Sequence, residues 1–98
     1  MDVHFTLHGI PFVWDSAKAR ANLGKHGVSF ETACEAFFDP FLRLTGAGDH
    51  DEDRLAFLGT TDRGRLLFVV YVERRHDVFR IISARPATPG ERREYEDL

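Results

Sequence analysis

The chain begins with two short segments whose hydrophobic positions indicate strands. Residues 3–7, VHFTL, alternate apolar and polar side chains, which is the period of a half-buried strand. The turn sequence HGIP follows, and FVW at residues 12–14 is a second extended segment. We expect one of these two strands to form an edge of a sheet.

From residue 15 the pattern is that of a helix. Asp15 or Ser16 can cap the first turn, and alanine and leucine recur through the next eight residues, which favours helical structure. Gly27 suits the left-handed conformation that closes a helix. The preceding Lys25 and His26 lie where the helix dipole favours positive charge, so their position needs no function to explain it.

A second helix is predicted from the next apolar repeat. Ser29 is a candidate cap, and the apolar residues that follow are spaced i, i+3, i+4 and i+7: Phe30, Ala33, Cys34 and Phe37. Asp39 precedes Pro40 and should end this helix, because a residue before proline avoids the helical region. Cys34 is the only cysteine, and we expect it in the core, since it can form no disulfide within the chain.

The second half of the chain predicts a sheet and one more helix. Extended segments are expected at residues 41–45, 54–61, 65–72 and 78–84. Short polar turns join the last three, which predicts an antiparallel meander with residues 65–72 in the centre. We expect the N-terminal strand or strands to complete an antiparallel sheet, with the two helices on one face. Thr88, Pro89 and Glu91 form a capping-box pattern that begins a charged helix at residues 89–97.

Length and composition favour a single α+β domain covering residues 1–98. The chain is 43% hydrophobic and 30% charged, as in globular proteins. Its longest apolar run, residues 66–72, is too short to span a membrane, and its first residues lack the features of a signal peptide. We therefore expect a cytoplasmic protein.

Charge is distributed unevenly along the chain. Residues 31–53 hold seven carboxylates against one arginine, a net charge of −6, so the other residues carry +3 of the overall −3. Asp49, Asp51 and Asp53 match the beginning of a calcium loop, but Arg54 and Thr60 stand where that loop needs glycine and glutamate. We expect no metal and no cofactor, and an anionic ligand is permitted.

Arginines stand at the ends of the predicted strands. Arg54 begins the first strand of the meander, Arg74 follows the second and Arg85 follows the third. In an antiparallel meander the first two share one end of the sheet, while Arg85 lies at the other. Arg85 also precedes a helix N-terminus, where anions bind, although the spacing alone favours its pairing with Glu91 or Glu94.

Several segments together resemble the BrnT family of bacterial toxins. They include KHGVSF at residues 25–30, RIISAR at residues 80–85 and the ERREY sequence near the end, within a match from about residue 12 to residue 95. The first eleven residues are an extension of the usual start. The resemblance implies a compact RelE-like α+β fold, ribonuclease activity and inhibition of translation.

The resemblance also implies site residues and partners. The candidate catalytic residues are Lys25, His26, Glu52, Arg54, Arg74, Arg85 and Tyr95. Metal-independent cleavage needs a base for the 2′-hydroxyl, an acid for the leaving oxygen, and cations for the phosphate. Glu52 or His26 is the candidate base, His26 or Tyr95 the candidate acid, and the lysine and arginines the phosphate ligands.

The implied partner is a BrnA-like DNA-binding antitoxin. A hetero-oligomer built on an antitoxin dimer would neutralise the toxin and bind operator DNA to repress the operon. A non-catalytic protein-binding module, or an inactive toxin homologue, is the alternative, because a cationic surface can equally meet an acidic partner. A metal-dependent nuclease is a third possibility.

Overall fold

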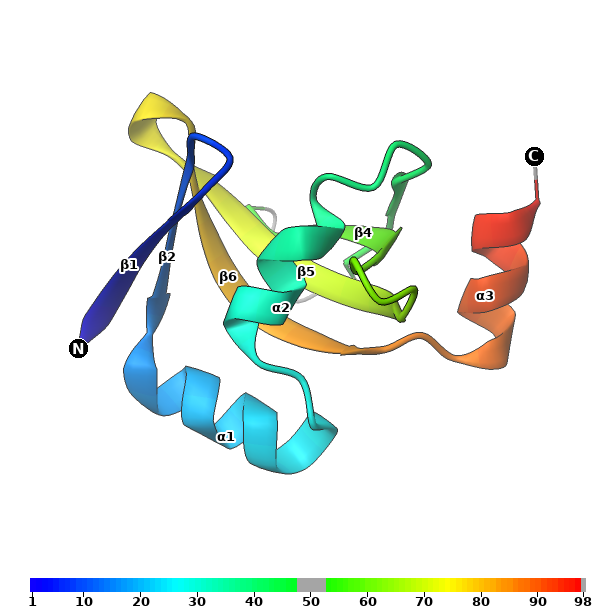
Figure 1. Cartoon of the computed structure of the whole chain (residues 1–98), viewed down its shortest axis with the longest axis horizontal. Helices are drawn as coiled ribbons and strands as arrows, with labels where there is room; N and C mark the ends of the chain where they lie inside the picture. Colours follow the sequence, from blue (N-terminus) through cyan, green and yellow to red (C-terminus); the bar gives the residue numbers. More distant parts are fainter. Residues whose placement is uncertain (48–52, 98) are drawn as a thin grey trace.

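The computed structural model describes residues 1–47 and 53–97. Its elements follow the chain in this order: β1 (Asp2–Leu7), β2 (Ile10–Asp15), α1 (Ser16–His26), α2 (Phe30–Ala36), β3 (Arg43–Thr45), β4 (Leu55–Thr60), β5 (Leu66–Arg74), β6 (Val78–Pro86) and α3 (Pro89–Glu96). A 3-10 turn, Arg75–Asp77, joins β5 to β6. The α+β fold and the expected helices are confirmed (Figure 1).

The strands form one sheet in the order β1-β2-β6-β5-β4-β3. The predicted meander is present as β4, β5 and β6, and β1 lies at an edge as expected. The expectation of a wholly antiparallel sheet is wrong, because β2 runs parallel to β6 over residues 12–13 and 79–80. Parallel pairing needs a long connection between its strands, and here that connection contains α1, α2 and the strands β3, β4 and β5.

Helices α1 and α2 cover one face of the sheet (Figure 1). The core on this face is rich in aromatic rings: Phe12, Trp14, Phe30, Phe57 and Tyr71 are almost fully buried. Phe37 packs edge-on against Phe57 and Tyr71, with ring centroids 4.6 and 5.1 Å apart. Cys34 is fully buried in the same core, as predicted, and burial raises the pKa of its thiol strongly.

The predicted helix boundaries are largely confirmed by their caps. Asp15 accepts a hydrogen bond from the backbone N–H of Lys18, and Gly27 closes α1 at φ 68°. Ser29 caps α2, and Thr88 with Glu91 forms the expected capping box at α3. These signals are local in sequence, which is why the chain alone could identify them.

Helix α2 is shorter than expected, since it ends at Ala36 and not at Asp39. The Asp39 carboxylate accepts hydrogen bonds from the backbone N–H groups of Phe41 and Thr60. These bonds tie the chain after α2 to the end of β4, and a continuing helix could not make them. The expected strand at residues 41–45 is likewise reduced to Arg43–Thr45.

The sheet has a second face, opposite α1 and α2. Alternation along β5 places Phe68, Val70, Val72 and Arg74 on this face. The cross-strand register adds Arg80, opposite Val72, and Arg85, opposite Phe68. We call this surface the second face. No helix in the described part of the chain is long and apolar enough to cross a membrane.

Candidate functional site

Lys25 and His26 end α1 beside the connection to α2. Lys25 is exposed and His26 is half-buried, and neither forms an ion pair or a side-chain hydrogen bond with any residue the structure describes. The left-handed Gly27 donates its N–H to the Leu23 carbonyl and stops the helix directly after them. Both cationic side chains are therefore free to meet a ligand.

These two residues line a groove of about 240 Å³ between α1 and β6, which we call the α1/β6 groove. It is formed by Lys18, Ala21, Asn22, Lys25, His26, Ile82 and Ser83. Asn22 is the buried residue that fixes it: its amide nitrogen donates to the carbonyls of Val28 and Ala84, at 2.9 and 2.8 Å. Its amide oxygen accepts from the N–H of Ala84 at 3.1 Å. Asn22 thus pairs with the edge of β6 as a neighbouring strand would.

A β-bulge in β6 places Ser83, which lines the groove, on the same face of the strand as Arg85. Tyr71 pairs with Ile81 and Val70 with Ser83, so Ile82 is the additional residue. Ser83 and Arg85 are two residues apart on the second face, which corresponds to roughly 7 Å along a strand. Arg85 therefore lies on the same face of β6 as Ser83, although it is not among the residues that line the groove.

Arg85 is held by two neighbours. Its guanidinium forms two parallel bonds of 2.8 Å with the Glu91 carboxylate, and it lies 4.3 Å from the centre of the Phe68 ring. The hydrogen bonds from Arg85 lower the pKa of Glu91 despite partial burial, and they raise the pKa of Arg85. The pairing expected from the sequence is present, so a phosphate at Arg85 must share it with Glu91 or displace Glu91.

Tyr95 lies one helical turn beyond Glu91 and points to another acid. Its hydroxyl donates to the Asp39 carboxylate. Burial raises the pKa of Tyr95, and the bond to Asp39 adds to this effect. Burial acts in the same direction on Asp39, but the donors Tyr95, Thr60 N–H and Phe41 N–H outweigh it and lower the pKa of Asp39. In this arrangement Tyr95 keeps its proton and anchors α3.

Arg54 and Arg74 lie at the other end of the sheet. Arg74 ends β5, six residues from Phe68, the partner of Arg85, which corresponds to roughly 20 Å along the strand. Arg54 directly precedes β4, whose first residue Leu55 pairs with Tyr71 near that same end. The predicted separation of these arginines from Arg85 is confirmed. Glu52 lies outside the described residues, as do Asp49 and Asp51 of the calcium-loop pattern.

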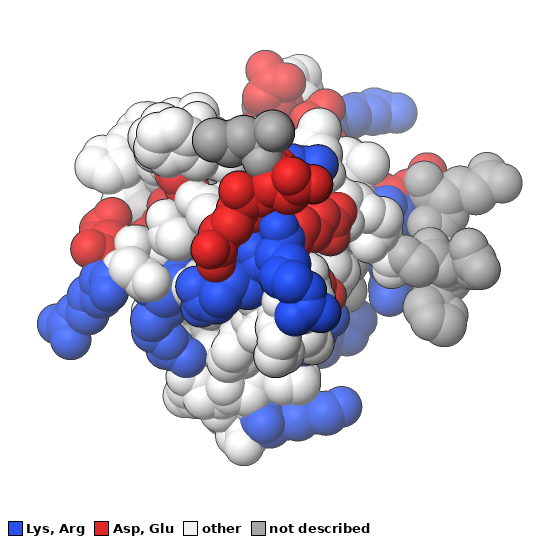
Figure 2. All heavy atoms as spheres, turned by 90° about the vertical axis from the view of Figure 1, so that its right-hand side faces the viewer, with Lys and Arg blue, Asp and Glu red and all other residues white. Residues whose placement is uncertain are grey.

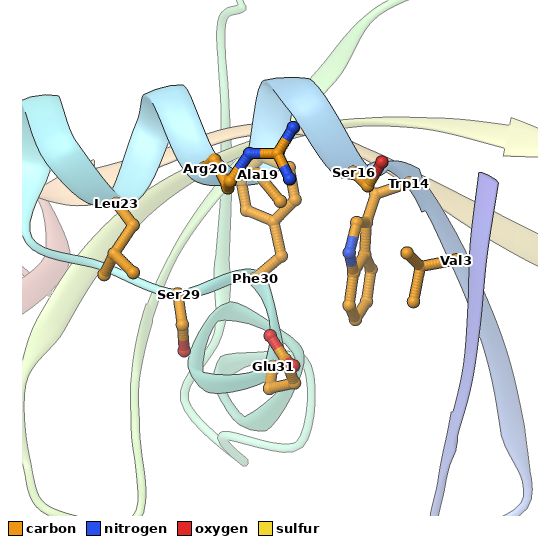
Figure 3. Close-up of a pocket in the computed structure, with 9 residues that line it drawn as sticks. All are labelled: Val3, Trp14, Ser16, Ala19, Arg20, Leu23, Ser29, Phe30 and Glu31. Atoms are coloured by element: carbon orange, nitrogen blue, oxygen red, sulfur yellow. The ribbon is translucent and has the colours of Figure 1, made fainter. Parts of the chain in front are cut away.

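The opposite side of α1 borders a different cavity (Figure 3). About 250 Å³ in volume, it is lined mainly by apolar groups from β1, β2, α1 and α2, with Trp14 and Phe30 in its wall. Arg20 and Glu31 bring opposite charges to it. This cavity thus has charged residues of both signs, whereas the α1/β6 groove has lysine and histidine but no acidic residue.

The end of the molecule that carries α3 has mixed charge. Figure 2 shows acidic side chains directly beside basic ones there, with no extended patch of one sign. Polar bonds hold α3 in place, since none of its residues is buried: Thr45 donates to Glu94, and Arg43 donates to the carbonyl of Asp97. By contrast, the α1/β6 groove has no carboxylate in its lining. An anion would therefore meet no acidic side chain in this groove.

The structure therefore groups the predicted residues. Lys25 and His26 on α1 line the α1/β6 groove, and Arg85 lies two residues after the groove residue Ser83 on β6. Tyr95 lies on α3 beyond Glu91, and Arg54 and Arg74 lie apart. Sequence reasoning missed Lys18 and Ser83 in the groove. The spacing of seven residues between Lys18 and Lys25 places both on one side of a helix and could have found Lys18. Ser83 depends on the bulge, for which the chain has no local signal.

Comparison with known proteins gives the family. Residues 14–91 match the family of the ribonuclease toxin BrnT of type II toxin-antitoxin systems. The crystal structure of the Brucella abortus ribonuclease toxin BrnT is similar at a TM-score of 0.56 and 24% identity, covering 76% of this chain and 92% of that chain. This likeness shows the shared fold, and no curated protein sequence matches the chain. Because the family match spans most of the sequence, the chain belongs to the BrnT family of ribonuclease toxins of type II toxin-antitoxin systems.

Proposed function

We propose that this protein is a toxin that cleaves RNA without a metal ion and thereby inhibits translation. The α1/β6 groove carries this proposal, because it combines Lys25 and His26 with a lining that has no carboxylate. Attack by the 2′-hydroxyl on the neighbouring phosphate builds negative charge on the phosphate oxygens. Fixed cations stabilise that charge, and histidine can transfer the protons near neutral pH.

Each of the other candidate residues has a proposed role. Glu52 or His26 takes the proton of the 2′-hydroxyl, and His26 or Tyr95 protonates the leaving oxygen. Lys25 and Arg85 bind the phosphate being attacked, with the planar guanidinium matching two of its oxygens. Arg54 and Arg74, at the far end of the second face, bind RNA away from the cut. Binding at Arg85 requires that the guanidinium exchange Glu91 for phosphate.

We further propose the partners. A toxin of a type II system acts with an antitoxin, and we assign this role to a BrnA-like DNA-binding protein. The toxin binds an antitoxin dimer, and the complex represses its own operon at operator DNA. The neutralised toxin is then unable to bind RNA through its cationic groove. Co-expression of the two proteins should give a hetero-oligomer, and a lone toxin chain on size measurement contradicts this proposal.

The experiment is induced expression in a bacterial host, with and without the neighbouring open reading frame. We expect growth arrest and loss of RNA with the wild type, and relief of both by His26→Ala or Arg85→Ala. His26→Ala is the cleaner variant, because His26 forms no side-chain bond within the described chain, whereas Arg85→Ala also frees Glu91. A thermal unfolding transition for each purified variant shows that it folds.

A non-catalytic binding module is the second candidate function. The observation in its favour is that Arg85 and Tyr95 are already bonded to Glu91 and Asp39, as they would be in a purely structural role. Intact RNA and normal growth with a folded wild-type protein would favour this module. Arg85→Ala would then weaken partner binding without any effect on growth.

A further inference from the structure

Helix α1 presents positive charge on two of its sides, and the two sides differ in what surrounds them. Lys18 and Lys25 are seven residues apart and line the α1/β6 groove. Arg20 lies on the same helix but borders the apolar cavity shared with α2, which Glu31 also lines (Figure 3). One helix thus contains a groove-facing lysine and a comparable cation that faces away from the groove.

The two lysines stand two helical turns apart in the groove. Seven residues of α-helix span ~10.5 Å, so the two side chains can reach separate phosphates of one strand. Lys25 and His26 are adjacent at the end of the helix, so they can meet a phosphate together. Lys18, near the start of α1, then meets a different phosphate of the same strand.

The groove between the lysines is fixed and lacks negative side chains. Asn22 lies between them in sequence; two hydrogen bonds with Ala84 hold it to β6, and one with the Val28 carbonyl holds it to the connection between α1 and α2, so it keeps α1 in place. Asp15 is the nearest acid in sequence, and it accepts from the backbone N–H of Lys18 as the helix cap. Among described residues, the Lys18 ammonium forms no ion pair.

We propose that the α1/β6 groove is a track for the backbone of single-stranded RNA, in which Lys18 binds a phosphate outside the scissile one. Lys25 and His26 meet the phosphate at the cut, and the Ser83 hydroxyl offers a further hydrogen bond between the two positions. This inference rests on the proposed RNA substrate. It adds a binding subsite that contributes affinity for longer RNA without taking part in the chemical step.

Binding is measured first, with RNA that cannot be cut. An oligoribonucleotide methylated at every 2′-hydroxyl is titrated against wild type, Lys18→Gln and Arg20→Gln over a series of salt concentrations. We expect Lys18→Gln to weaken binding at low salt on the order of threefold to fivefold. The slope of log affinity against log salt should fall by about 0.7, the value for one lysine–phosphate pair on a single strand.

Arg20→Gln is the matched control, because it removes one positive charge from the same helix outside the groove. We expect it to bind RNA like the wild type. Equal weakening by the two substitutions would overturn the subsite, since it would reflect only the net charge of the protein. Unchanged binding in Lys18→Gln would overturn it as well. Both side chains are exposed, and equal thermal transitions show that both variants fold.

Cleavage is measured separately on unmodified RNA. With saturating substrate we expect Lys18→Gln to cut at the wild-type rate, and with a dinucleotide its efficiency should match the wild type. A lower rate at saturation would place Lys18 in the chemical step and overturn the inference. If the wild type binds through Lys18 but cuts nothing, the subsite stands and the ribonuclease proposal fails. If the wild type cuts RNA and Lys18→Gln binds RNA normally, the ribonuclease proposal stands and the Lys18 subsite fails.

Discussion

Asn22 connects the helix that carries Lys25 and His26 to the strand that carries Ser83 and Arg85. Replacing it with alanine leaves two carbonyls and one N–H of the backbone without their partner in a buried place. An unsatisfied buried polar group costs about 1–3 kcal/mol. We expect Asn22→Ala to lower the free energy of unfolding by about 3 kcal/mol, measured by urea denaturation.

The control for Asn22→Ala is Arg20→Ala, two residues earlier on the exposed surface of α1. Its effect should stay within about 0.5 kcal/mol, as for ordinary surface substitutions. Asn22→Asp separates the contributions further, because it keeps the acceptor for Ala84 N–H and removes the two donated bonds. If Asn22→Ala and the wild type had similar free energies of unfolding, the prediction would fail, because water would have replaced the hydrogen bonds of the amide.

Glu91 makes stability depend on pH. The bonds from Arg85 lower its pKa below the ordinary value of 4.5, so the folded state favours the ionised carboxylate. This contribution is complete above pH 4.5 and is lost as pH falls through the lower pKa of the folded state. We expect Glu91→Gln to cost about 1–2 kcal/mol at neutral pH and progressively less under acid conditions.

The measurement for Glu91 is urea denaturation of both proteins from neutral to acid pH. A difference between them that stays constant below pH 4.5 would contradict the role of the ionised pair. Glu96→Gln is the control on the same helix, because Glu96 is exposed and its substitution should leave the pH profile unchanged.

At the residue scale, the sequence predicted the helix caps, which depend on residues that are close together in the chain. Gly27, Ser29 and the pair Thr88 and Glu91 cap their helices as their local patterns indicated. The bond from Tyr95 to Asp39 joins residues 56 positions apart. No local pattern could reveal it, because it depends on how α3 packs against the start of β3 and the end of β4.

At the scale of the elements, one glycine allows α2 and β4 to approach each other closely. A Cβ atom at Gly59 would lie 2.7 Å from the carbonyl oxygen of Ala36, the last residue of α2. Backbone atoms cannot give way as a flexible side chain does, so the helix and strand must move apart. We expect Gly59→Ala to destabilise the protein by about 2 kcal/mol, measured by urea denaturation.

Gly46→Ala is the matched control for Gly59→Ala. A Cβ at this position meets nothing within 4 Å, and Gly46 does not have a positive φ. We expect Gly46→Ala to leave stability unchanged or slightly higher, since alanine restricts the unfolded chain more than glycine does. Equal destabilisation by the two substitutions would contradict the clash with Ala36.

Helices and strands were predictable where the periodic pattern of apolar and polar residues continued along a whole segment. Alternation and short turns identified the meander β4, β5 and β6, and β5 is buried on both faces as expected. The parallel pairing of β2 with β6 was missed, because it joins only residues 12–13 with 79–80. The early end of α2 was also missed, since it depends on hydrogen bonds from Thr60 and Phe41 to Asp39.

At the scale of the whole molecule, the candidate site is distributed along the second face and the groove beside it. The sequence indicated which residues carry charge and that Arg54 and Arg74 lie away from Arg85. It could not show that Ser83 in the α1/β6 groove lies on the same face of β6 as Arg85, because this depends on the bulge in β6. The sequence did offer one signal for the groove: the seven-residue spacing of Lys18 and Lys25 puts both on one side of a helix.

Charge distribution over the whole chain leads to the last prediction. In the mechanism proposed above, lysine, arginine and histidine side chains stabilise the phosphate in place of a metal ion. We therefore expect RNA cleavage to continue at its full rate in excess chelator, measured with purified protein. Loss of activity that magnesium or calcium restores would point to residues 48–52, which lie outside the described structure and include Asp49, Asp51 and Glu52. The His26→Ala variant is the control: it should lose activity with or without chelator, because the proton transfer that we assign to His26 does not depend on a metal.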